Sequence, residues 1–177
     1  YNRRTDVKVA ANRAKVIAAL HARGIVVGDM NSNNLSVYPT GDVVLLDTDS
    51  FDIRIPGGEH FTCKVATAHY LAPELHGKDL NSPDAALTQG TDEFSLAIHI
   101  FQLLTGNYHP FNVKQADVSA SGDLAKQDYN IIRGNCPFVK QVPGGGIPAG
   151  APELSSVLSP ALIGDFTATF GYTLQPG

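Results

Sequence analysis

Cysteine is scarce in this chain of 177 residues, and its two cysteines stand far apart. Neither Cys63 nor Cys136 has the close spacing of a zinc site, so the cysteines predict no metal framework. Free thiols are typical of a reducing compartment, where disulfides are rare. We therefore expect a cytoplasmic protein.

Long apolar runs and clusters of basic residues are missing as well. No segment approaches the roughly twenty apolar residues that cross a bilayer, and no signal peptide is recognisable, so we expect no membrane span in this segment. The 13 Lys and Arg residues are outnumbered by 17 Asp and Glu residues and gather on no segment. This distribution argues against nucleic acid as a partner.

An initiating methionine is also lacking, since the sequence begins with Tyr1. What the sequence does contain is 43% hydrophobic residues, enough to fill one sizeable core in a chain of this length. We expect a globular domain that is a piece of a longer protein.

The most informative segment is residues 27–35, in which Asp29 is followed five positions later by Asn34, ahead of a short apolar run. In phosphotransferase catalytic loops with this spacing, the carboxylate takes a proton from a hydroxyl and the amide oxygen ligates Mg²⁺. Chance supplies the same spacing in many chains, and Asp and Asn also favour ordinary turns. Further matches in the right order are needed to decide.

A second match follows in residues 43–47. Four apolar residues, two of them β-branched, predict a buried strand that ends at Asp47. The turn at 38–42, rich in Pro, Gly and Asp, would lead the chain back beside residues 35–37. Asn34 and Asp47 would then lie side by side, as two hard oxygen ligands for one or two Mg²⁺ ions.

Two further segments complete the order. Residues 66–74 run from an Ala-Thr pair to the tripeptide Ala-Pro-Glu, and residues 91–96 open a strongly apolar helix. In order and spacing, the four segments together resemble the C-terminal lobe of a protein kinase of the bacterial serine/threonine type. The resemblance covers roughly residues 5–170.

This resemblance implies an α+β fold, mainly α-helical, with short β-hairpins around the catalytic loop and around an activation segment at 47–74. It implies one lobe over residues 1–177 that is truncated at both ends and lacks the N-terminal lobe. A whole kinase needs that missing lobe for its Gly-rich loop and its Lys–Glu ion pair. We therefore expect the isolated chain to bind Mg·ATP poorly.

The resemblance also implies roles for individual residues. Asp29 would be the general base, and Thr67 would brace Asp29 and help to receive the substrate. Asn34 and Asp47 would bind Mg²⁺ and, through it, the phosphates of ATP. The acceptor would be a serine or threonine hydroxyl of a protein.

Two acidic residues would support the site. Asp92 matches the buried carboxylate that opens the central helix of the lobe and accepts hydrogen bonds from the catalytic-loop backbone. Glu74 matches a residue that pairs with an arginine in the family, and none of the six arginines of this sequence stands where that partner should be.

Several positions depart from the family pattern. The catalytic Asp is preceded by Gly28 instead of an arginine, which normally pairs with a phosphate on the activation segment, so we expect activity without that phosphate. Asn31 replaces a lysine that grips the transferred phosphoryl group, and Thr48 replaces a phenylalanine. Asp49 could be a second metal contact, although a turn residue is the favoured interpretation.

These departures keep two alternatives open. A pseudokinase or binding scaffold is favoured by Gly28, Asn31 and Thr48. A small-molecule kinase of the aminoglycoside or choline type is favoured by Gly28 and opposed by Thr67 with the Ala-Pro-Glu ending at 72–74. The protein kinase is the preferred interpretation.

The pattern predicts a first helix with Thr5 or Asp6 as N-cap, Val7 and Ile17 on its buried face, and an end at Gly24. The remaining expected elements are strands at 25–27 and 35–37, a hairpin from 50–55 to 60–65, a central helix at 92–105, a helix pair at 112–133, a flexible linker at 143–150 and a helix at 158–170.

Overall fold

The computed structural model describes residues 2–115 and 126–173, and close contacts divide the chain into two compact units, residues 1–99 and 100–177. The first unit contains α1 (Arg3–His21), β1 (Ile25–Val26), β2 (Leu35–Val37), β3 (Val43–Leu45), β4 (Asp52–Arg54), β5 (His60–Phe61) and most of α2 (Gln89–Thr105). The second contains the end of α2, β6 (Lys114–Gln115), α3 (Lys126–Arg133), β7 (Gly145–Gly146), α4 (Leu154–Val157) and α5 (Pro160–Phe170).

Helix α1 begins earlier than predicted. Its N-cap is Asn2, whose side-chain oxygen accepts hydrogen bonds from the backbone N–H groups of Arg4 and Thr5. The predicted caps, Thr5 and Asp6, are therefore wrong and lie inside the helix. Val7 was also placed wrongly, because its side chain is 51% exposed, whereas the buried residues of α1 are Val9, Ala10 and Ile17.

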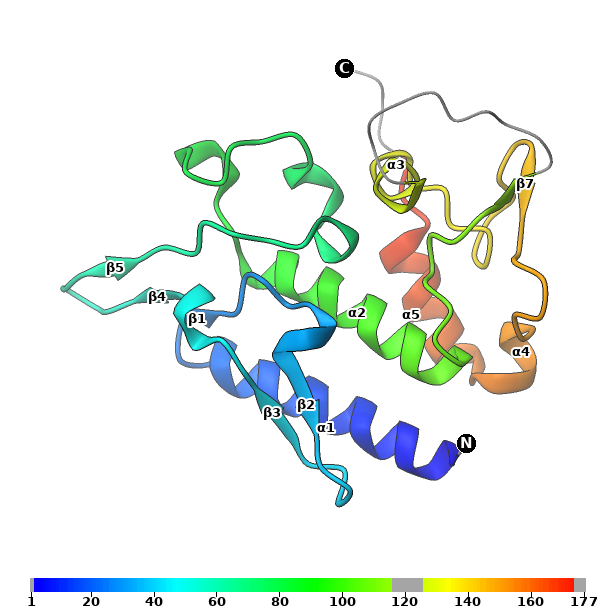
Figure 1. The fold of residues 1–177 in the computed structure, drawn as a ribbon, viewed down its shortest axis with the longest axis horizontal. Coiled ribbons are helices and arrows are strands. Elements are labelled where there is room, and N and C mark those ends of the chain that lie inside the picture. Colours follow the sequence, from blue (N-terminus) through cyan, green and yellow to red (C-terminus); the bar gives the residue numbers. More distant parts are fainter. Residues whose placement is uncertain (1, 116–125, 174–177) are drawn as a thin grey trace. The chain divides into compact units, whose positions relative to one another are not determined.

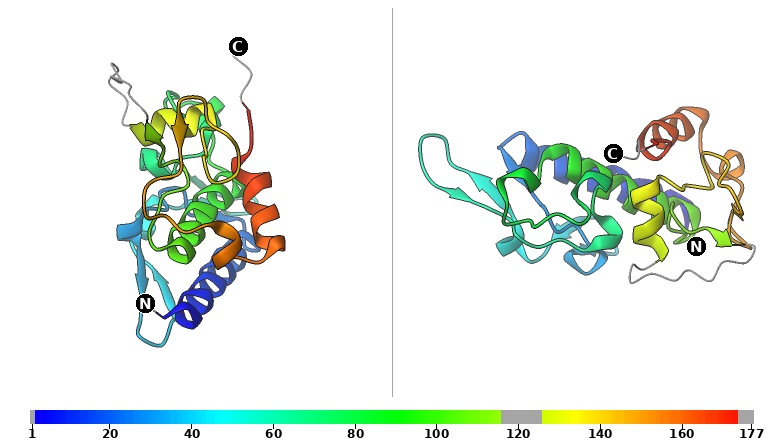
Figure 2. Two further views of the ribbon diagram at one scale, coloured as in Figure 1. Left: turned by 90° about the vertical axis from the view of Figure 1, so that its right-hand side faces the viewer. Right: turned by 90° about the horizontal axis from the view of Figure 1, so that it is seen from above.

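Two small antiparallel sheets lie beside α1 in the first unit (Figure 1). In the β2–β3 hairpin, Leu35 pairs with Leu45 and Val37 with Val43. The other sheet has the order β1-β4-β5. Its β4–β5 hairpin, which was predicted, extends away from α1 in Figures 1 and 2.

Strand β3 is more exposed than the predicted buried strand. Val44 is 38% exposed, and Leu46, which directly follows the strand, is 46% exposed. A hairpin of two strands that packs on a helix buries one face and leaves the other open, so the alternate residues of β3 remain accessible. The apolar run therefore predicted the strand correctly and its burial incorrectly.

Two clusters of buried side chains form the core of the first unit. One joins α1 to the sheets and contains Ile17, Val27, Met30, Leu35 and Phe51. The other contains Val26, Cys63, Leu75, Ala85 and Leu87. Val26 and Val27 thus bury their side chains in different clusters, which holds the chain just before Asp29 from two sides.

Helix α2 begins at Gln89 because two threonines cap it reciprocally. Thr91 Oγ1 accepts a hydrogen bond from the backbone N–H of Thr88, and Thr88 Oγ1 accepts one from the N–H of Thr91. The helix therefore starts before the predicted position at 92, and Asp92 lies in its first turn.

The second unit has an aromatic core. The Phe101 ring makes edge-to-face contacts with Phe138, Phe166 and Phe170, with ring centroids 5.0–6.0 Å apart.

The predicted linker at 143–150 is wrong in part, because Gly145 and Gly146 form β7 and pair with β6. Strand pairing uses backbone groups only, so residues without side chains can form it. Of the helix pair predicted at 112–133, α3 is present, and residues 116–125 lie outside the described residues.

The predicted α+β class is confirmed: five helices and small antiparallel sheets make up the described part of the chain. The arrangement particular to a kinase C-terminal lobe, and a single lobe over residues 1–177, stay predictions. None of the helices in residues 2–115 and 126–173 combines the length and the apolar character needed to cross a membrane.

Candidate active site

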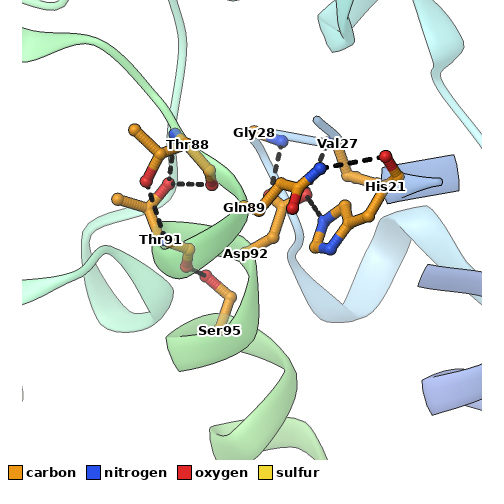
Figure 3. Close-up of polar contacts among 8 residues, drawn as sticks. All are labelled: His21, Val27, Gly28, Thr88, Gln89, Thr91, Asp92 and Ser95. Atoms are coloured by element: carbon orange, nitrogen blue, oxygen red, sulfur yellow. Dashed lines mark hydrogen bonds and ion pairs between the residues drawn. The ribbon is translucent and has the colours of Figure 1, made fainter. Parts of the chain in front are cut away.

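Asp92 ties the start of α2 to the segment that precedes Asp29 (Figure 3). The Asp92 side chain is fully buried, and its Oδ2 accepts hydrogen bonds from the Val27 N–H at 2.7 Å and from His21 Nε2 at 2.9 Å. Its Oδ1 accepts the Gly28 N–H at 2.9 Å. Both carboxylate oxygens are therefore used, and three donors from two segments are satisfied by one side chain.

Asp29 lies directly after this anchor, and its carboxylate is held by Thr67. The backbone N–H and the hydroxyl of Thr67 both donate to Asp29 Oδ1, each at 2.8 Å. The other oxygen, Oδ2, accepts a hydrogen bond from Asn31 Nδ2 at 2.9 Å. The two residues predicted as catalytic are thus in direct contact, although they come from separate segments of the chain.

Asn34 faces the same loop with its amide nitrogen. Nδ2 donates to the backbone oxygen of Asp29 at 3.0 Å, and within the described residues Oδ1 of Asn34 accepts no hydrogen bond. The backbone oxygen of Asn34 accepts the N–H of Leu46 at 2.9 Å, which continues the β2–β3 pairing by one residue. The pairing therefore places Asn34 next to the residue that precedes Asp47.

Asp47 has an exposed side chain on a left-handed backbone, with φ 56° and ψ 54°. Asp tolerates this conformation better than most residues. Ser50 anchors the turn, because its N–H and its hydroxyl both donate to the Asp47 backbone oxygen, at 3.2 Å and 2.9 Å. The carboxylate itself makes no hydrogen bond to the described residues, and Asp49 is exposed in the turn that follows.

The donor set formed by Asn34 and Asp47 suits Mg²⁺. The amide oxygen of Asn34 and the carboxylate of Asp47 accept no hydrogen bond from residues 2–115 or 126–173, and both are hard ligands. Mg²⁺ in phosphotransferase sites is bound by one or two such groups together with substrate phosphates and water. No cluster of three or more His, Cys, Asp or Glu side chains suited to a metal occurs in the part of the chain that the structure describes.

Helix α2 presents polar side chains on one face at the spacing i, i+3 and i+7 from Asp92. Ser95 Oγ donates to the backbone oxygen of Tyr70 at 2.6 Å. The His99 ring bonds through Nε2 to the backbone oxygen of Met30 at 3.0 Å and stacks on the Tyr70 ring, with centroids 4.3 Å apart. One helix face thus contacts the residue after Asp29 and the segment that follows Thr67.

Sequence reasoning missed Ser95, His99 and the pairing of His21 with Asp92. The available signal was the row of polar residues along α2, a helix that is otherwise strongly apolar. Buried polar side chains in such a helix need partners, and those partners are backbone groups of other segments.

Burial shifts the pKa of two groups in this unit. Desolvation raises the pKa of the Cys63 thiol, which lies under the loop that carries Asp29. Desolvation also lowers the pKa of the Arg13 guanidinium on α1, whose Nη1 donates to the backbone oxygen of His99 at 3.4 Å. In both cases burial penalises the charged form of the group.

Glu74 is exposed and makes no ion pair with any of the described residues. It lies in the short turn Pro73–Leu75, whose neighbours Ala72 and Leu75 are buried. The support roles expected for Glu74 and Asp92, the metal role of Asn34 and Asp47, and the catalytic roles of Asp29 and Thr67 all stay predictions.

Comparison with known proteins shows that the sequence of this chain is similar to those of protein kinases. The chain is 39% identical over 125 residues to Protein kinase YegI of Escherichia coli K12, a match that covers 71% of the chain and 19% of that protein. It is 30% identical over 133 residues to a putative ribosomal protein S6 kinase alpha-2 of Caenorhabditis elegans, covering 75% of the chain and 16% of the relative. The chain is a homologue of protein kinases.

This kinase homologue spans about a fifth of the length of the curated relatives that it matches. No protein-family model matches it. The relatedness to kinases agrees with the order of the four segments at 27–35, 43–47, 66–74 and 91–96.

Proposed function

We propose that the protein carrying this chain is an ATP-dependent protein kinase, which transfers the γ-phosphoryl group to a serine or threonine hydroxyl of a protein and uses Mg²⁺. The observation that carries the proposal is the Asp29 carboxylate, whose Oδ1 receives two hydrogen bonds from Thr67. The loop that bears it is anchored on the buried Asp92. A carboxylate fixed in this way orients an acceptor hydroxyl and takes its proton.

The proposed reaction forms no covalent bond between the substrate and the protein. Asp29 accepts the hydroxyl proton while the hydroxyl oxygen bonds to the γ-phosphorus, and the bond from that phosphorus to the bridging oxygen breaks, so ADP leaves with the electron pair. Asn34 and Asp47 would hold the metal, which when bound neutralises the phosphate charge. The contribution of the protein is position, since a correctly oriented pair of reactants lowers the barrier without new bonds to the enzyme.

A scaffold without catalytic activity is the second candidate, and Asn31 favours it. At this position a lysine would reach the transferred phosphoryl group. Asn31 is neutral, and its amide group donates to Asp29 Oδ2 at 2.9 Å instead. Such a site would retain its shape and lack the positive charge that phosphoryl transfer uses.

The experiment uses the full-length protein with γ-labelled ATP. We expect label on serine or threonine of a protein acceptor, loss of labelling with EDTA, and a fall of about 10²- to 10⁴-fold for Asp29→Asn. The matched control is Asp42→Asn, an exposed carboxylate in the β2–β3 turn that should keep wild-type activity.

Three outcomes separate the candidates. Label on a protein hydroxyl supports the kinase. Label on an aminoglycoside or choline hydroxyl, with none on protein, would replace it with the small-molecule kinase favoured by Gly28. A folded full-length protein that labels no acceptor, with Asp29→Asn equal to wild type in partner binding, would favour the scaffold.

A further inference from the structure

Gly28 occupies a position where no side chain fits. Its φ is +77°, in the left-handed region. A β-carbon here would lie 2.5 Å from Sγ of Cys63, 3.0 Å from Cβ of Cys63 and 3.1 Å from the backbone oxygen of Ser50. Non-bonded heavy atoms pack at about 3.5–4.0 Å, so even an alanine methyl group would displace a neighbour.

The Cys63 sulfur that closes this space is itself held in place. Cys63 is 5% exposed and belongs to the buried cluster that contains Val26 and Leu75. Its thiol also donates to the backbone oxygen of Val65 at 3.1 Å. The sulfur therefore has little freedom to move away from Gly28.

This contact joins the same two segments as the hydrogen bonds between Thr67 and Asp29. Gly28 directly precedes Asp29, and Cys63 lies shortly before Thr67. The N–H of Gly28 also donates to Asp92, so this residue touches both α2 and the segment at 47–74. The close fit between Gly28 and Cys63 thus lies next to the hydrogen bonds between Thr67 and Asp29.

We propose that Cys63 is a positioning residue, whose sulfur packs against Gly28 and holds the activation segment on the catalytic loop so that Thr67 stays bonded to Asp29. The inference rests on the proposed kinase function. In this proposal the contact between Gly28 and Cys63 holds the activation segment on the catalytic loop. In the kinase family an arginine at position 28, paired with a phosphate, would otherwise hold it. A larger residue at position 28 and the sulfur of Cys63 cannot occupy the site together.

The chain offers a matched control for the test. Gly24 has nearly the same backbone conformation, with φ +73°, and a β-carbon there would meet nothing within 4 Å. Gly24→Ala therefore carries the same left-handed strain without the steric conflict. The difference between Gly28→Ala and Gly24→Ala isolates the contact with Cys63.

The experiment compares Gly28→Ala, Gly24→Ala, Cys63→Gly and the double variant Gly28→Ala/Cys63→Gly in the full-length protein. The readouts are kcat and KM with ATP and a protein acceptor, and amide hydrogen exchange over residues 63–71. We expect Gly28→Ala to lower kcat about tenfold or more and to speed exchange at Thr67. Gly24→Ala should stay within about twofold of wild type. The double variant should recover at least about threefold in kcat over Gly28→Ala, because the sulfur is gone.

If Gly28→Ala does not fold, a second pair decides. Cys63→Ala should speed exchange at Thr67 and lower kcat, whereas Cys136→Ala, which removes another buried thiol, should do neither. Equal exchange and equal kcat for the two members of either pair, or no recovery in the double variant, would overturn the positioning role. Absence of phosphoryl transfer by the wild type would defeat the proposed function alone, since the exchange data would still report on the contact.

Discussion

Replacing Asp92 with alanine should lower the free energy of unfolding more than any substitution of an exposed residue on α2 does. The buried carboxylate accepts from two backbone N–H groups, those of Val27 and Gly28, and from His21. Its removal leaves two buried donors without an acceptor, at about 1–3 kcal/mol each. Because one partner of a buried hydrogen-bonded network is lost, we expect a decrease of about 4 kcal/mol in the free energy of unfolding.

Two features sharpen this estimate. Alanine has the higher helix propensity by a few tenths of a kcal/mol, but the negative charge of Asp92 in the first turn of α2 favours the helix by a similar amount. The two effects nearly cancel, so the measured loss is attributable to the missing acceptor. Asp92→Asn should recover little, because both carboxylate oxygens accept hydrogen bonds and an amide offers only one oxygen.

The assay is urea denaturation followed by far-ultraviolet circular dichroism, with exchange of the Val27 and Gly28 amides as a local readout. Glu93→Ala is the control, since Glu93 is exposed and adjacent on the same helix. A loss for Asp92→Ala below about 1 kcal/mol, or equal to that of the control, would refute the idea that this carboxylate anchors the loop.

Four further predictions concern the site and the buried thiols. Thr67→Ala should lower kcat about tenfold in steady-state kinetics, because it removes a hydroxyl hydrogen bond to the Asp29 carboxylate that is worth about 1.5–3 kcal/mol. Thr67→Ser keeps the hydroxyl and should keep the rate, so equal rates for the two variants would contradict this prediction. Asp47→Asn should raise the Mg²⁺ concentration for half-maximal rate about tenfold or more, while Asp49→Asn should leave the metal titration unchanged. Phosphatase treatment should not lower activity, because Gly28 offers no guanidinium to a phosphate on the activation segment. A loss of activity on treatment would contradict the proposal that the contact between Gly28 and Cys63 takes the place of such a phosphate. Burial raises the pKa of Cys136 to about 12, so the folded protein keeps this proton while the unfolded thiol ionises near its ordinary value of 9.0. Because the unfolded state loses this proton first, the free energy of unfolding is unaffected below pH 9 and decreases as the pH rises toward 12, by about 1 kcal/mol at pH 10. In urea titrations at these pH values, the free energy of unfolding of Cys136→Ala should decrease less steeply with pH than that of the wild type.

Local patterns predicted the hairpin that brings Asn34 beside residue 46. Two short apolar runs around a turn rich in Pro, Gly and Asp were sufficient, because β2 and β3 pair with their nearest neighbours in sequence. The same patterns misjudged burial: the apolar run at 43–46 indicated a strand, and only the packing partner decides which face is covered. The N-terminus of α1 was misplaced for a similar reason, since Asn2 offers an earlier cap than the residues chosen.

The spacing of polar residues predicted which side chains would supply oxygen atoms to a phosphotransferase site, and their order along the chain indicated the relationship to kinases. The tertiary structure alone decided how those side chains are held. Thr67 reaches Asp29 across 38 positions, and Asp92 reaches Val27 across 65. Such contacts form only when separate segments pack into one core, because the free energy that brings them together comes from buried apolar neighbours and not from the bonded residues themselves.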